Sequence, residues 1–158
     1  MAPMGMRPES RGSIHIRAVD PAVHPAIKPN YLSDTLDQQV MVAGLRMGRK
    51  IAASPALSRL IKREATPGIH LQTDQELLSY AEQNGQPGYH PVGTCSMGRD
   101  RSSVVDPRLR VHGIEGLRVV DASIMPRLVS GNTNAPAIMI GEKAADMILA
   151  DARQFSVA

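Results

Sequence analysis

The chain has 158 residues, of which 42% are hydrophobic but only 3% aromatic, and its formal net charge is +3. This length is typical of one domain. Because aromatic side chains are scarce and the basic and acidic residues are interspersed, we expect no nucleic-acid partner. The single cysteine, Cys95, excludes an internal disulfide, and the five histidines are too scattered to predict a metal site.

The start of the chain carries no sign of a targeting segment. Charges and two prolines stand in residues 1–12, where a secretion signal would have an apolar run. No stretch approaches the roughly 18 apolar residues of a membrane span. We therefore expect a soluble protein in the reducing cytoplasm.

The first elements are a strand and a proline-rich connection. Residues 1–11 show no periodicity and predict an irregular lead-in. Residues 12–17 alternate between apolar and polar side chains, with Ile14 and Ile16 on one face, which is typical of a half-buried strand. Three prolines between residues 21 and 29 then exclude a helix, so the chain must be extended or turn.

Three helices are predicted next. Ser33 is a suitable N-cap for a long helix that ends near Ala53. Ser54 and the proline after it predict a short second helix through Ile61. Residues 73–76 form a capping-box pattern for a third helix, which Asn84 and the following glycine end.

The second half alternates glycines and prolines with short β-type runs, and it ends in a helix. These runs are residues 104–105, 109–111 and 117–120. A polar loop at residues 130–135 leads to a helix that Pro136 opens. One face of that helix carries Ile138, Gly141, Ala145 and Ile148. The mixture of strands and helices predicts an α+β fold.

No single residue decides the chemistry. The chain lacks the glycine-rich turn that cradles a pyrophosphate and the glycine-flanked serine of many hydrolases. Two motifs stand out, His90–Gly98 (HPVGTCSMG) and Ser130–Pro136 (SGNTNAP). Taken alone, a histidine ahead of a glycine-bearing strand is more often structural.

Together, however, the motifs resemble a known family. The block from His90 to about Asp151 closely resembles the C-terminal segment of the glucose-methanol-choline (GMC) family of FAD-dependent alcohol oxidoreductases. Residues 7–33 are similar to the lead-in of that family's substrate domain, in its choline dehydrogenase-like branch. Such enzymes begin with a glycine-rich βαβ unit that holds the FAD pyrophosphate. The resemblance therefore implies a fragment, roughly the last third of an enzyme, whose N-terminal FAD-binding half is missing.

The resemblance also implies a reaction and its two catalytic residues. The family oxidises an alcohol by passing hydride from the carbinol carbon to flavin N5 while a base takes the hydroxyl proton. His90 matches the family's base, a role that imidazole suits because it titrates near neutral pH. Asn132 matches the residue that holds and orients the alcohol oxygen.

Four further residues match the family's flavin contacts. Asp121 and Ala122 correspond to the contact with the ribityl and phosphate region, although a turn cap is the ordinary role of such an aspartate. Asn134 and Ala135, with N–H groups just beyond Pro136, lie where the positive end of a helix would face the reduced flavin. We expect FAD in the complete enzyme and not on this chain alone.

The implied organisation follows the family. Residues 1–11 are the lead-in, and residues 12–98 are a portion of the substrate domain, with a largely antiparallel sheet and the helices of residues 33–84 on one face. Residues 99–153 return with a strand and a helix that belong to the FAD domain in the complete enzyme, and residues 154–158 are a tail.

The resemblance leaves the fragment's own behaviour open. We expect it to be inactive without the FAD-binding half, and the alternative is a stable non-catalytic remnant or assembly module. Self-association through the exposed face of the last helix is expected. The complete enzyme is expected in the cytoplasm, with membrane association as a further alternative.

Overall fold

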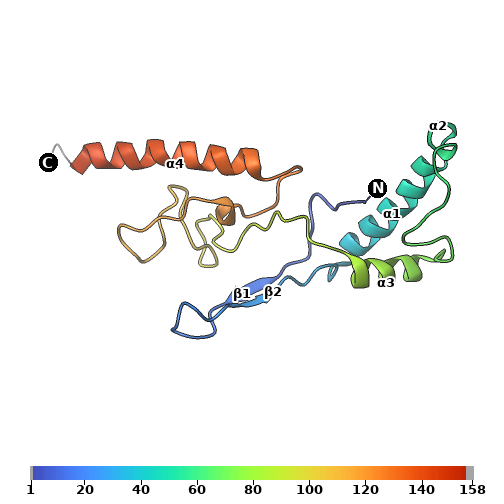
Figure 1. The fold of residues 1–158 in the computed structure, drawn as a ribbon. Coiled ribbons are helices and arrows are strands. Elements are labelled where there is room, and N and C mark those ends of the chain that lie inside the picture. The colour runs from blue at the N-terminus through green and yellow to red at the C-terminus, as the bar shows by residue number, and fades with distance from the viewer. Residues whose placement is uncertain (1, 156–158) are drawn as a thin grey trace. The chain divides into compact units, whose positions relative to one another are not determined.

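The computed structural model describes the backbone of residues 2–155 and the side chains of residues 2–153. The chain divides into two compact units, Met1–Gly88 and Tyr89–Ala158 (Figure 1). This division falls earlier than the boundary expected after residue 98. Of the expected tail, Gln154 and Phe155 continue the last helix, and residues 156–158 lie outside the described part of the chain.

The first unit contains a two-stranded antiparallel sheet. Strand β1 (Ser13–His15) pairs with strand β2 (Ala26–Lys28), and Ser13 lies opposite Lys28 (Figure 1). The sequence predicted β1 but not its partner, which lies in the proline-rich stretch. Prolines precede and follow β2 directly, where they remove no hydrogen bond from its three residues.

No helix packs on this sheet within the described residues. Every residue from 11 to 24 is exposed. Among the described elements, the two hairpin strands contact only each other. The arrangement with helices on one face of a larger sheet therefore stays a prediction for a longer protein.

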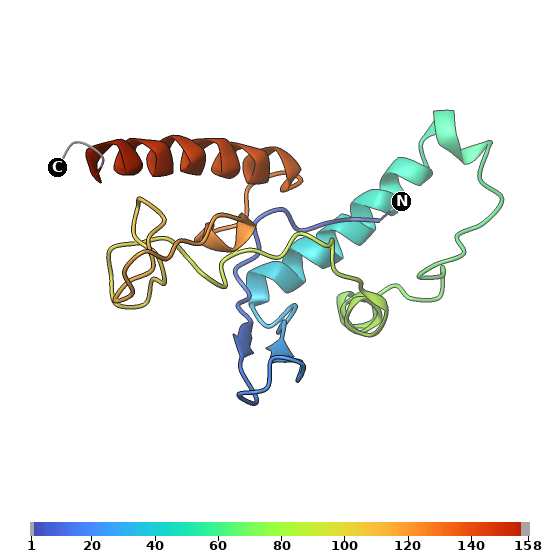
Figure 2. The same cartoon turned by 60° about the vertical axis from the view of Figure 1, so that its left-hand side comes forward.

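Three helices complete the first unit: α1 (Thr35–Ala52), α2 (Pro55–Ser58) and α3 (Asp74–Asn84). Asp34, not Ser33, is the N-cap of α1, and its carboxylate accepts the Leu36 N–H at 2.8 Å. Helix α2 ends at Ser58, earlier than predicted. A long connection then returns the chain to α3 (Figure 2), which packs on α1.

Residues 2–11 of the predicted lead-in have no helix or strand, and hydrogen bonds join them to α1. The Asp37 carboxylate accepts the N–H groups of Glu9 (2.9 Å) and Ser10 (2.7 Å). Partial burial raises the pKa of Asp37, but the hydrogen bonds from Ser10 and Glu9 outweigh it, so the pKa lies below its usual value.

The second unit consists of loops, a short 3₁₀ helix η1 (Ala122–Ile124) and a 22-residue helix α4 (Asn134–Phe155). The predicted strands of this half are wrong. In the described residues they form only isolated bridges, which pair Met97 with Val105, Val105 with Val111 and Arg110 with Arg118. Turns with positive φ at Leu109, Gly113 and Gly116 interrupt them. The fold is therefore a mixture of helices with one small antiparallel sheet.

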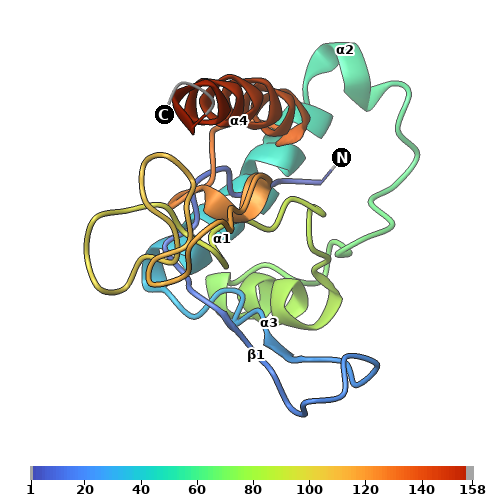
Figure 3. The ribbon, with the colours of Figure 1, turned by 90° about the vertical axis from the view of Figure 1, so that its left-hand side faces the viewer.

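Helix α4 begins at Asn134, two residues before the predicted start. Helix α4, seen nearly along its axis in Figure 3, packs on η1. Its inner face contributes Ile140 and Ala144 to the core of this unit, together with Val105, Leu109, Ile124 and Met125. Near its C-terminal end, Asp151 accepts hydrogen bonds from Arg108 and Arg118. Partial burial raises the pKa of Asp151, but these two hydrogen bonds lower it overall.

Candidate active site

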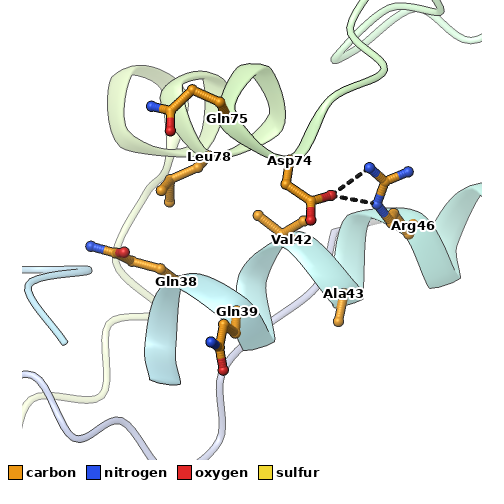
Figure 4. Close-up of a pocket in the computed structure, with 8 residues that line it drawn as sticks. All are labelled: Gln38, Gln39, Val42, Ala43, Arg46, Asp74, Gln75 and Leu78. Atoms are coloured by element: carbon orange, nitrogen blue, oxygen red, sulfur yellow. Dashed lines mark hydrogen bonds and ion pairs between the residues drawn. The ribbon is translucent and has the colours of Figure 1, made fainter. Parts of the chain in front are cut away.

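A shallow hollow lies between α1 and α3 in the first unit. Its volume is about 290 Å³, and it is lined by Gln38, Gln39, Val42, Ala43 and Arg46 of α1 and by Asp74, Gln75 and Leu78 of α3 (Figure 4). The Asp74 carboxylate accepts two hydrogen bonds from the Arg46 guanidinium. Because both charged groups are already paired and none of the predicted site residues lines it, the hollow is not a candidate for the chemistry.

The predicted site residues all lie in the second unit, where main-chain hydrogen bonds bring two of their segments together. The Cys95 N–H donates to Ser123 O at 3.0 Å, and the Met97 N–H donates to Ile124 O at 2.8 Å. The His90–Gly98 motif therefore runs beside η1, which follows Asp121 directly.

The backbone beside His90 has unusual conformations. Tyr89 has a φ of 59°, in the left-handed region that bulky residues rarely adopt. The residue is 78% exposed. Gly93 has a φ of 88°, and a Cβ there would lie 3.3 Å from Met125 O. Left-handed backbone at a residue such as tyrosine costs about 1–3 kcal/mol and is found most often at functional sites.

His90 itself joins this motif to the start of α4. Its Nδ1 lies 2.9 Å from Thr133 Oγ1, and the Thr133 N–H donates toward the same nitrogen at 3.5 Å. His90 is partly buried, as is Thr133. Since Asn132 precedes Thr133 directly, the two residues predicted to be catalytic lie in neighbouring segments although they are 42 positions apart in sequence.

The start of α4 presents unused backbone donors. The first helix hydrogen bond runs from the Ala137 N–H to Thr133 O at 2.9 Å. The N–H groups of Asn134 and Ala135 precede it, both residues are exposed, and Pro136 has no N–H. The Ala137 N–H, just beyond Pro136, donates to Thr133 O, and the flavin contact expected of N–H groups beyond Pro136 stays a prediction.

Asp121 has the ordinary role of a turn cap. Its Oδ1 accepts the Ser123 N–H at 2.7 Å, and it is the N-cap of η1. The residue is nevertheless exposed, and the cap uses only one of its two carboxylate oxygens. Ala122 is partly buried, and its carbonyl accepts the Met125 N–H at 3.2 Å.

These residues fit the cofactor that the sequence predicts. Two exposed backbone donors at the positive end of a 22-residue helix suit an electron-rich ring edge. A carboxylate oxygen on Asp121 is a suitable acceptor for hydroxyl groups such as those of a ribityl chain. Asp121 can make such a contact through its other carboxylate oxygen and keep its hydrogen bond with the Ser123 N–H.

The sequence did not identify Thr133 or the strain at Tyr89 as features of the site. The available signal for Thr133 was its place directly before a helix whose third residue is proline. No sequence signal predicts the positive φ of Tyr89, because that backbone conformation is imposed by the fold around it.

The described residues contain neither a metal site nor a membrane-spanning helix. No group of three or more histidine, cysteine or acidic side chains is placed to hold a metal ion. No described helix combines the length and the apolar composition that crossing a bilayer requires.

The chain matches a known protein family over most of its length. The family model for GMC oxidoreductase matches residues 8–141. The chain is 50% identical over 142 residues to an alcohol dehydrogenase (acceptor) of Pseudomonas putida, and 51% identical over 143 residues to an oxygen-dependent choline dehydrogenase of Escherichia coli strain K12. Each alignment covers 90% of this chain and 26% of the relative.

The fold has a solved counterpart. An FAD-dependent oxidoreductase from Chaetomium thermophilum superposes with a TM-score of 0.86 and 34% identity, covering 94% of this chain and 26% of the other. The chain thus spans about a quarter of the length of the proteins it matches. On the family match and these similarities, this chain belongs to the GMC oxidoreductase family.

Proposed function

We propose that this chain is the C-terminal part of an FAD-dependent oxidoreductase that oxidises the CH–OH group of an alcohol. Its relatives include an alcohol dehydrogenase and a choline dehydrogenase. The observation that carries the proposal is the 2.9 Å contact between His90 Nδ1 and Thr133 Oγ1, since it brings the histidine of one motif to the asparagine-containing loop of the other.

His90 and Asn132 divide the work on the alcohol. Imidazole accepts a proton near neutral pH, so His90 takes the proton of the hydroxyl group. A carboxamide is a poor base at that pH, and the exposed Asn132 side chain holds the alcohol oxygen by hydrogen bonding. Fixing that oxygen orients the carbinol C–H for transfer.

The N–H groups of Asn134 and Ala135, with Asp121 and Ala122, hold the cofactor. When bound, FAD would supply the oxidant, with its N5 as the acceptor for the hydride of the carbinol carbon. The contribution of this chain is to stabilise negative charge on the ring with backbone donors at the start of α4.

The remaining three quarters of such an enzyme would supply the pyrophosphate site. The chain contains no glycine-rich dinucleotide-binding turn, so by itself it is inactive and holds no flavin. We place the complete enzyme in the cytoplasm, where a free thiol such as Cys95 persists; association with a membrane is the alternative location.

The test grafts this chain onto the first three quarters of the Pseudomonas putida relative and measures alcohol-dependent dye reduction. His90→Ala is expected to lower kcat about 100-fold or more, the usual contribution of a general base. Asn132→Ala should raise KM and lower kcat. His24→Ala removes an exposed histidine of the β1–β2 hairpin and should change neither parameter.

Two outcomes would contradict the proposal. The first is turnover by the His90→Ala graft within twofold of the His24→Ala control. The second is stoichiometric flavin absorbance from the purified 158-residue chain, which would show that the rest of the enzyme is not needed to hold FAD. A graft that binds FAD but never turns over alcohol would favour the non-catalytic module.

A further inference from the structure

Helix α4 has an acidic residue at the end of its inner face. Ile140 and Ala144 are buried in the core of the second unit, and Met147 packs against that core. Asp151 follows at the same spacing of three or four residues, so it lies on the same side of the helix. Its side chain is only 23% exposed, so its carboxylate depends on partners within the protein.

Both partners of this carboxylate belong to the loop structure that leads to Asp121. Arg108 donates to one Asp151 oxygen and Arg118 to the other. Arg118 also donates to the carbonyl of Arg108, and it forms a backbone bridge with Arg110. It stands three positions before Asp121, and its side chain is only 16% exposed. The carboxylate therefore joins α4 to the segment that carries one of the proposed cofactor contacts.

The apolar contacts and the ion pairs of α4 restrain different movements. Hydrophobic contact is non-directional, so the packing at Ile140 and Ala144 holds α4 against the unit more firmly than it fixes α4 along its own axis. Charged hydrogen bonds from guanidinium groups are directional, and two of them fix the position of one carboxylate. Because a helix moves as a rod with a rise of about 1.5 Å per residue, a displacement at Asp151 reaches Asn134, about 25 Å away.

We propose that Asp151 is a positioning residue that sets the place of the start of α4. Its two ion pairs fix the helix along its axis, and the backbone donors of Asn134 and Ala135 are thereby held at a fixed place. That place is set relative to Asp121, because the arginines belong to the same loop structure. The inference rests on the proposed function only in what these donors contact, the electron-rich edge of a flavin. Such donors act only when they are already correctly placed.

The contact between Thr133 and His90 reports the place of the start of α4 without turnover or flavin, because it joins two side-chain atoms 2.9 Å apart. In the ¹⁵N,¹³C-labelled 158-residue chain, we expect Asp151→Ala to weaken the nuclear Overhauser effect between these side chains. The amide signals of Asn134 and Ala135 should shift as well, while the ¹³Cα shifts show that α4 remains helical. A contact that added only stability would leave these native-state signals unchanged.

Two matched variants separate the position of α4 from the loss of a charge. Asp146→Ala removes an exposed carboxylate from the same helix. Arg110→Ala breaks an ion pair with Asp106, which lies outside α4. Both variants should leave the signals from the start of α4 unchanged, whereas Arg118→Ala should reproduce the effect of Asp151→Ala.

Unchanged signals in folded Asp151→Ala would overturn the inference. Should that variant fail to fold, Arg108→Ala removes the more exposed of the two partners, and the same signals decide. In the grafted enzyme, we expect Asp151→Ala to weaken the stabilisation of reduced flavin about tenfold, which lowers its two-electron potential by about 30 mV relative to Asp146→Ala. Shifted signals with an unchanged potential would refute the proposed flavin contact and leave the positioning role standing.

Discussion

The connection between α2 and α3 has no helix or strand of its own, and one arginine organises it. Arg49 donates to both carboxylate oxygens of Glu64 at 2.8–3.1 Å. It also donates to the carbonyls of Leu71 (2.7 Å) and Gly68 (3.0 Å). Only about a fifth of each charged side chain is exposed, 22% for Arg49 and 21% for Glu64. The hydrogen bonds from Arg49 hold the pKa of Glu64 below its usual value.

Replacing this carboxylate should destabilise the chain in a pH-dependent way. We expect Glu64→Gln to lower the free energy of unfolding by about 1–3 kcal/mol at neutral pH, the usual range for a hydrogen bond to a charged group. Because the folded-state pKa is depressed, the stabilisation is complete above the unfolded value of about 4.3 and is lost as the pH falls through the folded value.

Urea unfolding at neutral and acidic pH measures this effect. The difference between wild type and Glu64→Gln should shrink toward zero in acid. Glu82→Gln removes the same charge from an exposed site on α3 and should change stability by less than about 0.5 kcal/mol. A Glu64→Gln deficit that persists unchanged in acid would rule out the ion pair as its cause.

The sequence could propose His90 and Asn132 for the site because each lies in a specific motif. It could not name Thr133, whose contact with His90 spans 43 positions. Asp121 shows the limit of motifs most clearly. The cap that a lone aspartate ordinarily forms is present, and the cofactor contact proposed for the same carboxylate requires a bound ligand to test.

At the scale of elements, two helices of the first unit begin with contrasting caps. At α3 the Thr73 hydroxyl accepts the Glu76 N–H (3.2 Å), and the Glu76 carboxylate accepts the Thr73 N–H (2.8 Å). Hydrogen bonds from the backbone of Thr73 and Gln72 hold the pKa of Glu76 below its usual value. At α2 the Ser54 side chain makes no capping hydrogen bond.

The two caps should therefore respond differently to the loss of their hydroxyl groups. Thr73→Ala is expected to lower the free energy of unfolding by about 1 kcal/mol, because an N–H at the start of α3 loses its acceptor. Ser54→Ala removes a hydroxyl that makes no capping hydrogen bond. It should lower the free energy of unfolding by about a few tenths of a kcal/mol at most. Thermal unfolding followed by circular dichroism compares them, and equal losses would contradict the assignment of the α3 cap.

Helices were more predictable than strands for a physical reason. The start and end of α3 depend on local residues, Thr73 and Gly85, which the sequence displays directly. A strand needs a partner segment, and alternation says nothing about where that partner lies. Residues 117–120 have β-type side chains, yet within the described chain they contribute only the bridge from Arg118 to Arg110.

At the scale of the whole molecule, the exposed apolar surface is the prominent feature. In the β1–β2 hairpin, Ile16 is 89% exposed and Ile27 is 64% exposed. A hairpin of this size with apolar side chains in water is marginally stable without a third strand or a covering helix. Because the chain matches only a quarter of its relatives' length, we expect the rest of a full-length enzyme to cover these residues.

Helix α4 has the same property on its outer side. Ile140 and Ala144 are buried in the core of the second unit, whereas Ile138 (60%), Ile148 (46%) and Leu149 (55%) are exposed. Ile138, Ala145 and Leu149 follow one another at helical spacing, so they form a line along the face opposite the core. A helix that is apolar on two faces normally has two neighbours.

The isolated chain should therefore bury this outer face against a second copy of itself. We expect sedimentation velocity to detect dimers or larger species whose fraction rises with protein concentration. Leu149→Lys should shift the population toward monomer, because a buried unpaired ammonium is costly. Ala150→Lys adds the same charge at an exposed position nearer the polar side of α4 and should leave association unchanged. A wild-type chain that stays monomeric at every concentration, with α4 still helical by hydrogen exchange, would show that this face tolerates water.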